Sequence, residues 1–407
     1  LSSVKEFLPS SIINTHKLIP LVTAIEQAHY PTNEETKSHA YKRLAFQEAL
    51  LVQLVVLQRR KTIESIAKSV IIKNCPGILK SFFSSLPFQL TQEQKLALKE
   101  ILDDIANPNQ PMSRLLQGEV GSGKTVVALA ALLLAAANGY QGAIMAPTEV
   151  LAEQHFINIR SLLGGAVNSA DNDYKFSLNF NDLENPVTIG LLLGNFTQKR
   201  KGTIAKDLAE CQIDIIIGTH AIIQPSLAIP NLAFAVTDEQ HRFGILQRTA
   251  LREKGKGPHI LAMSATPIPR SLGLTVYGDL DISTIRQLPT GRLPIKTKYV
   301  KPEQRSAAYR HIKKEVGLGH QAFIIFPLIE ESATLQVRAA TIEYERIKSI
   351  VFPDLKVGLL HGRMSLPEKQ SVMEKFRASE LDILVATPVI EVGIDVPNAS
   401  VILIESA

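Results

Sequence analysis

The sequence predicts an α/β protein in which two tandem units, each with a parallel sheet, follow a helical segment. Three observations favour this fold class. Short apolar runs of strand length alternate with helical stretches, a pattern typical of parallel sheets covered by helices on both faces. A Pro- and Gly-bearing segment at 289–294 divides this alternation into two series. An early apolar run also leads directly into a glycine-rich loop and then into a helix.

The composition is that of a globular protein. The chain has 407 residues, of which 45% are hydrophobic and 20% charged, enough for two or three domains with buried cores. Its two cysteines, Cys75 and Cys211, exclude a disulfide framework and a four-cysteine zinc site. The net charge of +5 permits a nucleic-acid partner but does not by itself indicate one. The most apolar run, 126–137, is too short to span a membrane.

Three parts follow one another along the chain. Residues 1–85 are expected to be helical, because leucines recur near helical spacing across 40–60. The first α/β unit covers 86–288, and its expected strands are 114–116, 143–146, 213–217, 234–237 and 259–263. The second unit covers 289–407, and its expected strands are 322–326, 356–360, 382–386 and 401–404. The Ala- and Leu-rich run 126–137 predicts a helix buried against the first sheet.

The glycine-rich loop of the first unit reads GEVGSGKT and matches the phosphate-binding pattern G-x-x-x-x-G-K-[ST]. Glycines let backbone N–H groups curl round phosphate oxygens, and the N-terminus of the following helix adds partial positive charge. Lys124 is expected to reach the β- and γ-phosphates of a nucleotide, and the Thr125 hydroxyl to bind Mg²⁺. The predicted phosphate-binding residues are Gly118, Gly121, Ser122, Gly123, Lys124 and Thr125.

A pair of carboxylates follows the apolar run 232–237. Asp238 is expected to hold Mg²⁺ through water, and Glu239 to orient and deprotonate the attacking water. An acidic pair at a strand end is more often only solvated, but the phosphate-binding loop upstream favours the catalytic interpretation. Gln240 and His241 come next, where they either couple the nucleotide to a second site or complete a local hydrogen-bond network.

Polar residues also follow other strands of the first unit. Threonine hydroxyls and loop N–H groups at such places suit contacts to a nucleic-acid backbone, and the same threonines fit helix caps equally well. The residues in question are Pro147, Thr148, Glu149, Gly218, Thr219 and His220. In the second unit, equivalent strand ends hold His361, Arg363 and Thr387. The basic run 198–201 is interpreted as a solvated face.

Two further segments flank the nucleotide site in the prediction. Ser264 and Thr266 follow the apolar run 260–263, where they either bridge the Asp238 loop to a second site or form an ordinary turn. Upstream of the phosphate-binding loop, Gln94 is able to pair with the adenine N6 donor and N7 acceptor, and Phe88 to pack on the base. The alternative is a helix start in which Gln94 completes a capping box, and both interpretations hold together without conflict.

Taken together, these motifs closely resemble superfamily 2 helicases and, within them, the bacterial RecG family of branch-migrating DNA helicases. The segments that carry the resemblance are GEVGSGKT at 118–125, MAPTEVLAEQH at 145–155, DEQHRFG at 238–244, IEVGIDVPNA at 390–399 and RLAFQEALLVQL at 43–54. The transcription-repair coupling factor has a similar motor, but typically carries Asp-Glu-Glu where this chain has Asp-Glu-Gln-His. A P-loop switch that gates a protein partner is a further alternative, and it needs only one α/β unit.

The resemblance implies tandem RecA-like P-loop domains that bind ATP and Mg²⁺ and act on branched duplex DNA. It implies a role at stalled forks and Holliday junctions in recombination and repair, as a monomer in the bacterial cytoplasm and without a membrane. Lys124 and Asp238 take catalytic roles beside Glu239, while Ser264 and Thr266 couple hydrolysis to motion. Gly393 and Asp395 face the nucleotide from the second unit.

Two departures from the family pattern qualify this expectation. The family usually has two threonines where this chain has Thr387 and Pro388, and proline removes an N–H donor from that loop. Both ends also look like cuts through a longer helicase. A wedge domain is expected before residue 1 and a segment with an arginine finger after residue 407. The isolated chain is therefore expected to bind ATP but to hydrolyse it slowly, with weak specificity for forks.

Overall fold

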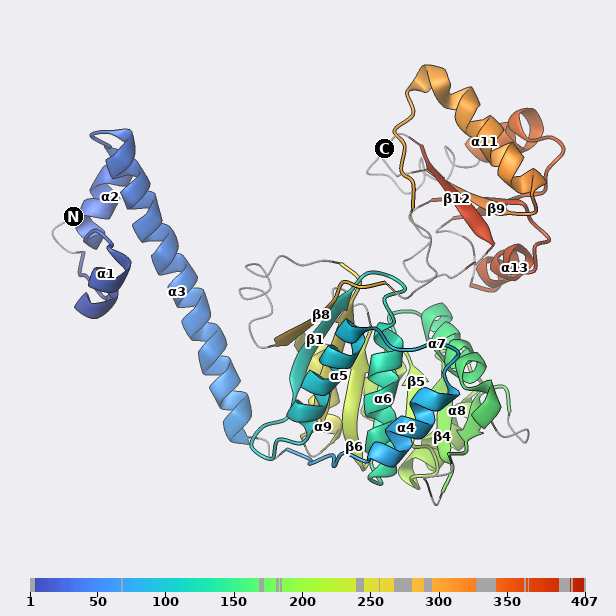
Figure 1. Ribbon diagram of the computed structural model, residues 1–407, viewed down its shortest axis with the longest axis horizontal. Helices are drawn as coiled ribbons and strands as arrows, with labels where there is room; N and C mark the ends of the chain where they lie inside the picture. The colour runs from blue at the N-terminus through green and yellow to red at the C-terminus, as the bar shows by residue number, and fades with distance from the viewer. Residues whose placement is uncertain are drawn as a thin grey trace. The chain divides into compact units, whose positions relative to one another are not determined.

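The computed structural model describes residues 4–405 except 67–68, 168–171, 181–182, 184, 239–244, 256, 267–279, 289–294, 327–341, 362–363, 365, 388–395 and 397. The chain forms two compact units, Leu1–Gly291 and Arg292–Ala407 (Figure 1). Within the described part, no helix has both the length and the apolar character needed to cross a bilayer.

The first unit begins with three helices, α1 (Ser10–His16), α2 (Leu21–His29) and α3 (Glu34–Ile66). The predicted helix over 40–60 is part of α3, which starts earlier than expected. Its start is fixed by the preceding Asn33, whose Oδ1 accepts a hydrogen bond from the Thr36 backbone N–H at 2.8 Å.

An ion pair with a buried arginine joins the segment before α1 to α3. The side chain of Arg43 on α3 is fully buried, and its Nη2 lies 2.6 Å from Oε1 of Glu6. The Glu6 carboxylate also accepts hydrogen bonds from the backbone N–H groups of Leu8 and Leu21, at 3.1 and 2.9 Å. The segment before α1 and the first turn of α2 are thereby fixed to α3, because a buried charge is stable only with such partners.

An eight-stranded sheet, sheet A, forms the centre of the first unit. Its strands are β1 (Ser113–Gly118), β2 (Gln141–Met145), β3 (Lys175–Leu178), β4 (Val187–Leu192), β5 (Ile215–Gly218), β6 (Leu232–Thr237), β7 (His259–Ser264) and β8 (Asp281–Ile285). Their order is β3-β4-β5-β2-β6-β7-β1-β8. All five predicted strands are present. The prediction of a parallel sheet is correct for every neighbouring pair except β3 and β4, which are antiparallel.

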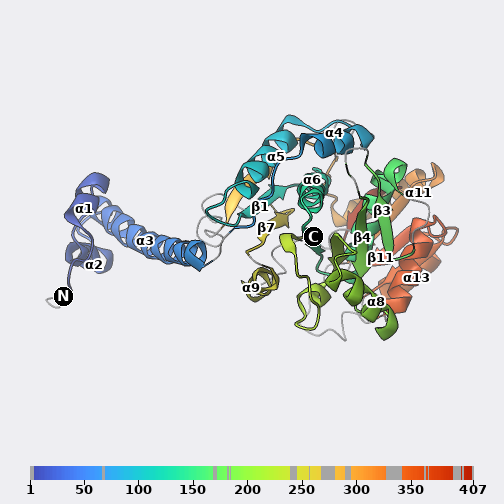
Figure 2. The same cartoon turned by 90° about the horizontal axis from the view of Figure 1, so that it is seen from below.

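Helices cover both faces of sheet A. They are α4 (Pro76–Ser85), α5 (Gln92–Ile105), α6 (Lys124–Ala137), α7 (Glu149–Leu162), α8 (Gln198–Ala209) and α9 (Ile245–Lys254). Figure 2 shows α4 and α5 on one side of the strands and α8 and α9 on the other. The sheet therefore has an apolar core on each face. Successive residues of β6 alternate between them, because Phe234 and Val236 pack in one apolar cluster and Ala235 in the other. As predicted for 126–137, α6 is apolar on all sides, and the side chains from Val126 to Ala135 are buried.

The second unit contains a smaller sheet, sheet B, with order β10-β11-β9-β12 and only parallel pairs. Its strands are β9 (Gln321–Ile325), β10 (Val357–Leu360), β11 (Ile383–Ala386) and β12 (Ala399–Ile404), which correspond to the four predicted strands. Its two longer helices are α11 (Arg305–Gly317) and α13 (Leu366–Arg377). They pack on opposite faces, since Ile312 and Phe376 belong to different apolar clusters.

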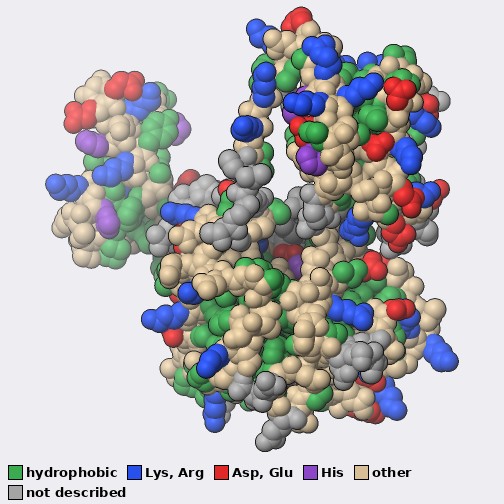
Figure 3. Space-filling model, turned by 45° about the vertical axis from the view of Figure 1, so that its right-hand side comes forward, with side chains coloured by type: hydrophobic (Ala, Val, Ile, Leu, Met, Phe, Trp, Pro, Cys, Tyr) green, Lys and Arg blue, Asp and Glu red, His purple; other side chains and the backbone are tan. Residues whose placement is uncertain are grey.

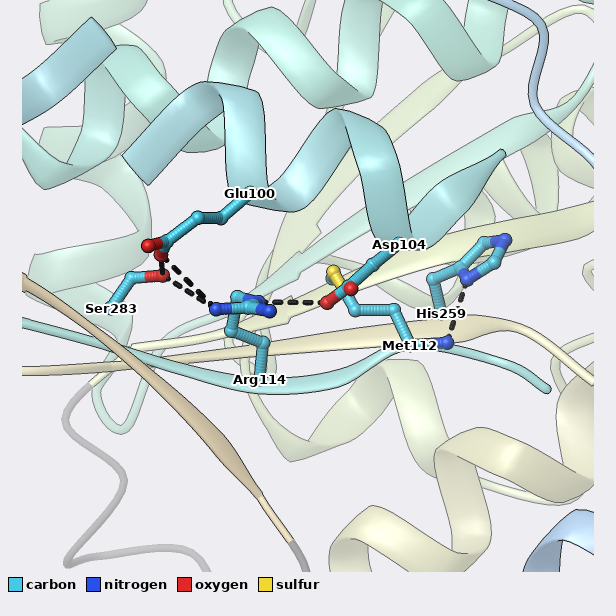
Figure 4. A network of polar contacts seen from close by, with 6 residues as sticks. All are labelled: Glu100, Asp104, Met112, Arg114, His259 and Ser283. Atoms are coloured by element: carbon cyan, nitrogen blue, oxygen red, sulfur yellow. Dashed lines mark hydrogen bonds and ion pairs between the residues drawn. The ribbon is translucent and has the colours of Figure 1, made fainter. Parts of the chain in front are cut away.

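Polar contacts fix α5 against sheet A on the side away from the glycine-rich loop (Figure 4). Arg114, near the start of β1, donates from Nε to Asp104 at 2.8 Å and from Nη1 to Glu100 at 3.2 Å. The same Nη1 donates to the Ser283 hydroxyl of β8 at 2.8 Å. One arginine thus joins a helix and two neighbouring strands through charge-assisted hydrogen bonds.

A buried histidine holds the segment before α4 against the same end of the sheet. The Nδ1 of His259 accepts a hydrogen bond from the Met112 N–H at 2.9 Å, and its Nε2 lies 2.6 Å from the Val70 carbonyl oxygen. These partners require the neutral ring with its proton on Nε2. Burial lowers the pKa of His259 to about 4, from an ordinary value of 6.5.

This pKa predicts acid sensitivity of the first unit. Between pH 6.5 and 4, His259 is protonated in the unfolded chain but stays neutral in the folded chain. The free energy of unfolding therefore falls as the pH decreases through this window. The expected contribution of this residue is about 3 kcal/mol, lost progressively on acidification. In urea denaturation at a series of pH values, the free energy of unfolding of the wild type should fall between pH 6.5 and 4 more steeply than that of His259→Asn. The asparagine side chain cannot titrate.

The matched control is His29→Asn, because His29 is exposed at the end of α2. It should keep the wild-type pH dependence of the urea midpoint. If His259→Asn also kept that dependence between pH 6.5 and 4, His259 would not be the source of the acid sensitivity.

Candidate nucleotide-binding site

The predicted site residues of the first unit gather at one edge of sheet A. Strands β1, β2, β5, β6 and β7 run parallel, so their carboxyl ends share that edge. In open parallel sheets, ligands bind at this edge. The segments that reach it are the loop at 119–123 and the residues Thr148, Thr219, Asp238 and Ser264.

The loop between β1 and α6 has the tight turn that the glycines predict. Gly121 and Gly123 adopt positive φ values of 79° and 82°, which side chains disfavour. The Ser122 N–H donates to the Glu119 carbonyl at 3.1 Å. The Lys124 ammonium donates to the carbonyl oxygens of Gly118 at 2.7 Å and Glu119 at 3.0 Å, so its charge lies at the loop.

Close packing makes the glycine at position 118 necessary. A Cβ on Gly118 would lie 2.5 Å from the Ser122 hydroxyl and 2.8 Å from the Ile285 carbonyl oxygen on β8. The Ser122 hydroxyl itself is buried and has no hydrogen-bond partner among the described residues. A buried hydroxyl of this kind is costly unless a ligand satisfies it, as a phosphate oxygen would. The loop therefore fits a bound phosphate group.

Gln94 connects α5 to this loop. Its Oε1 accepts from the Thr91 N–H at 2.8 Å while its own N–H donates to the Thr91 hydroxyl at 3.2 Å, so the predicted capping box is confirmed. Its Nε2 donates to the Ser122 carbonyl oxygen at 2.7 Å. Phe88, just upstream, is 39% exposed and so presents ring surface to solvent. Adenine recognition by Gln94 and Phe88 stays a prediction.

Asp238 follows β6 and is held from two sides. Its backbone N–H donates to the Met145 carbonyl at the end of β2, at 2.9 Å. Its Oδ2 lies 2.7 Å from Nε2 of His155 on α7, a contact that the sequence did not predict. The Thr237 hydroxyl beside it is buried without a partner in the described part of the chain. Thr125 is half-buried in the first turn of α6.

Three predicted residues of this region lie outside the described residues. They are the expected base Glu239 and the expected coupling residues Gln240 and His241. Their roles stay predictions.

Ser264 and Thr266 form a compact turn after β7. Their hydroxyl oxygens are 3.0 Å apart, and the Thr266 N–H donates to the Ser264 hydroxyl at 3.2 Å. The Thr266 carbonyl oxygen accepts from Nε2 of Gln117 at 3.3 Å. Because Gln117 immediately precedes the phosphate-binding loop, this bond joins the loop to the turn. This bond was not predicted from the sequence; the signal that could have indicated it is the polar residue Gln117 directly after Leu115 and Leu116.

The segment after β2 begins helix α7. The Thr148 hydroxyl accepts from the Leu151 N–H at 3.3 Å, which confirms the cap alternative for this residue. Pro147 precedes it. Oε1 of Glu149 accepts from the Asn195 N–H at 3.0 Å, and a Cβ on Gly194 would lie 2.6 Å from the same oxygen. Glu149 therefore joins the segment after β2 to the segment after β4.

The segment after β5 does not contain the helix cap that was one of its two predicted interpretations. Gly218 ends β5, and a Cβ there would lie 2.4 Å from the Leu192 carbonyl oxygen. Thr219 makes no side-chain cap, so the cap alternative is wrong for it. Its hydroxyl is buried without a partner among the described residues, and the following His220 is exposed.

One residue of the basic run 198–201 is not simply solvated. The Arg200 guanidinium lies 4.8 Å from the ring centre of Tyr174 and 4.7 Å from that of Phe196. Two cation–π contacts of this kind restrict the side chain. Arg200 also lies in the first turn of α8, which begins shortly after β4 ends.

In the second unit, His361 follows β10 and Thr387 follows the neighbouring parallel strand β11. The Thr387 N–H donates to the Leu360 carbonyl at 3.2 Å, and its buried hydroxyl has no partner in the described part. The remaining predicted residues, Arg363, Gly393 and Asp395, lie outside the described residues.

Comparison with known families agrees with this geometry. Residues 91–273 match the DEAD/DEAH box helicase family, and residues 305–407 match the helicase conserved C-terminal domain. The fold and these matches together give the chain two RecA-like domains of the helicase type.

Within this class of domains, the chain is similar to RecG proteins, as the sequence motifs indicated. It is 44% identical to the ATP-dependent DNA helicase RecG of Synechocystis sp., over all of this chain and 47% of that protein. Identity to RecG of Aquifex aeolicus is 43%, over 99% of this chain and 49% of that protein. A structure of RecG bound to a three-way DNA junction superposes with a TM-score of 0.79 at 39% identity, covering 98% of this chain and 50% of that chain. The chain spans about half the length of these relatives.

The contact between Gly123 and Gln94 predicts a selective defect. A Cβ at Gly123 would lie 2.3 Å from Nε2 of Gln94, so Gly123→Ala must displace either Gln94 or the loop. We expect at least a tenfold loss of nucleotide affinity, measured by titration of a fluorescent ATP analogue, since a tenfold loss needs only about 1.4 kcal/mol.

Gly139→Ala provides a matched control. Gly139 also has positive φ, 76°, but a Cβ there would meet no atom within 4 Å. Both variants should lose about 1–2 kcal/mol of stability from backbone strain. Only Gly123→Ala should lose nucleotide affinity, and equal affinities in the two variants would show that the Gln94 contact is irrelevant to binding.

Proposed function

We propose that this chain is the motor region of an ATP-dependent DNA helicase that acts on branched DNA in recombination and repair. The observation that carries the proposal is the shared edge of sheet A. There, the phosphate-binding loop and Asp238 lie beside the strand-end segments suited to nucleic acid. The names of the relatives support ATP dependence and DNA as substrate, and the junction-bound relative supports branched DNA.

ATP with Mg²⁺ fits the residues at this edge. Lys124 and the backbone of the loop would hold the phosphates, while Thr125 and Asp238 would hold the metal. The partnerless hydroxyls of Ser122 and Thr237 support a polar ligand here. Mg²⁺ supplies positive charge that offsets the phosphate oxygens. Glu239 would accept the proton of the attacking water, and Gly393 and Asp395 would approach from the second unit.

DNA contacts are proposed at the remaining strand ends of sheet A and at those of sheet B. The candidates are Pro147, Thr148, Glu149, Gly218, Thr219, His220, His361, Arg363 and Thr387. Arg200 joins them, because its guanidinium is already restricted by two aromatic rings and makes no ion pair among the described residues. On the face shown in Figure 3, Lys and Arg side chains lie at many separate places, so local geometry supports these contacts better than net charge does.

Coupling between the two ligands is proposed through the turn after β7. Gln117 joins this turn to the phosphate-binding loop, so Ser264 and Thr266 are placed to respond to the nucleotide. Gln240 and His241 are proposed to extend the connection.

The proposed parts of the chain are a helical segment at 1–85 and motor domains at 86–288 and 289–407. The protein is proposed to work as a monomer in the bacterial cytoplasm.

A nucleotide switch without motor activity is the weaker alternative. A switch needs only one P-loop domain, whereas residues 305–407 match a second helicase domain. The two functions differ in their response to DNA.

DNA-dependent ATP hydrolysis tests the proposal. Phosphate release by the wild type should be slow, and it should rise when a three-way DNA junction or a linear duplex is added. Lys124→Ala should lower nucleotide affinity at least tenfold and abolish release, because removing the ammonium deletes a charge-assisted phosphate contact of about 1.5–3 kcal/mol. Lys99→Ala, an exposed lysine on α5, is the control and should match the wild type. Release that is unaffected by DNA would favour the switch.

A further inference from the structure

We propose that His155 is a positioning residue that ties the metal-binding carboxylate of Asp238 to the segment after β2. This inference rests on the proposed function, which assigns Asp238 to Mg²⁺ and the segment 147–149 to DNA. His155 itself touches neither ligand in the proposal. It acts by fixing the orientation of Asp238.

The contact is short and sheltered. Nε2 of His155 lies 2.7 Å from Oδ2 of Asp238, and the two side chains are only 13% and 14% exposed. A hydrogen bond to a carboxylate in such surroundings is stronger than one in water and restricts the rotation of the acceptor. Restriction matters because metal ligands depend on neighbouring groups for orientation, and losing such a neighbour typically lowers metal affinity by about 10–100-fold.

Two of the hydrogen bonds of Asp238 lie on either side of the segment after β2. Its backbone N–H is bonded to Met145, the last residue of β2, and its carboxylate to His155, on α7. Between these two anchors lie Thr148, which caps α7, and Glu149, which holds Asn195 at 3.0 Å. Asp238 is therefore bonded to residues on both sides of the segment that is proposed to contact DNA.

These contacts couple the proposed DNA site to the proposed Mg²⁺–nucleotide site. A shift of the N-terminal turn of α7 on DNA binding must move His155, because α7 is a continuous helix over Glu149–Leu162. Movement of His155 reorients the Asp238 carboxylate and so changes the affinity for Mg²⁺–nucleotide. By thermodynamic reciprocity, Mg²⁺–nucleotide must then change DNA affinity by the same factor.

Two variants of this chain separate positioning from simple packing. His155→Leu removes the hydrogen bond and replaces the imidazole ring with an apolar side chain of similar volume. His155→Gln keeps an uncharged N–H donor near the position of Nε2. Asn158→Leu, an exposed residue on the same helix, is the matched control for adding apolar surface.

Four quantities are measured for each variant. Two concern a fluorescent non-hydrolysable ATP analogue: the Mg²⁺ concentration at half-saturation and the affinity in EDTA. The others are the ratio of DNA dissociation constants without and with Mg²⁺–analogue, and the melting temperature. For His155→Leu we expect the Mg²⁺ midpoint to rise about tenfold. Its DNA ratio should fall towards one, while analogue affinity in EDTA stays unchanged. His155→Gln should recover most of both effects, and Asn158→Leu should match the wild type.

The outcomes decide between the possibilities. A wild-type Mg²⁺ midpoint and DNA ratio in His155→Leu would overturn the proposal, as would equal losses in the Leu and Gln variants with a parallel fall in melting temperature. If His155→Leu fails to fold, the His155→Gln variant decides. A wild-type Mg²⁺ midpoint and DNA ratio in His155→Gln would support the proposal. Loss of both in a folded His155→Gln protein would overturn it. A wild type that shows no Mg²⁺-dependent nucleotide binding would instead overturn the proposed function, and with it this inference.

Discussion

Parallel strand pairing is the constraint on which the candidate site depends. Strands β1, β2, β5, β6 and β7 are neighbours through parallel ladders, so the chain must return across the sheet after each one. Each return begins at the same edge. Segments far apart in sequence, such as the loop before Lys124 and the residue Asp238, are therefore brought to the same edge of sheet A. Helices on both faces bury the strands and leave that edge as the place for polar chemistry.

The phosphate-binding loop is held by contacts from several directions. Gln94 reaches it from α5, the Ile285 carbonyl of β8 packs against Gly118, and Gln117 connects its base to the turn after β7. Each contact involves a different element. A change in the loop is therefore felt by the elements around it, and the loop geometry depends on more than its own glycines.

The sequence predicted what depends on local pattern. The nine expected strands form, and the capping box at Gln94 and the cap at Thr148 are spacing rules that need no tertiary contact. Strands β3, β4 and β8 were missed because they are short or carry polar residues among the apolar ones, as in Asp281–Ile285. The His155–Asp238 contact was missed for another reason. Its partners are 83 residues apart, and only the folded sheet brings them together.

Buried hydroxyl groups mark the same edges of both sheets. Among the described residues, the buried hydroxyls that lack a hydrogen-bond partner are those of Ser122, Thr219, Thr237 and Thr387. Each lies at or just after the carboxyl end of a strand. An unsatisfied buried hydroxyl costs about 1–3 kcal/mol, and most proteins avoid it. Stability is therefore given up at the edges where ligands are proposed to bind, and polar ligands at those edges would restore it.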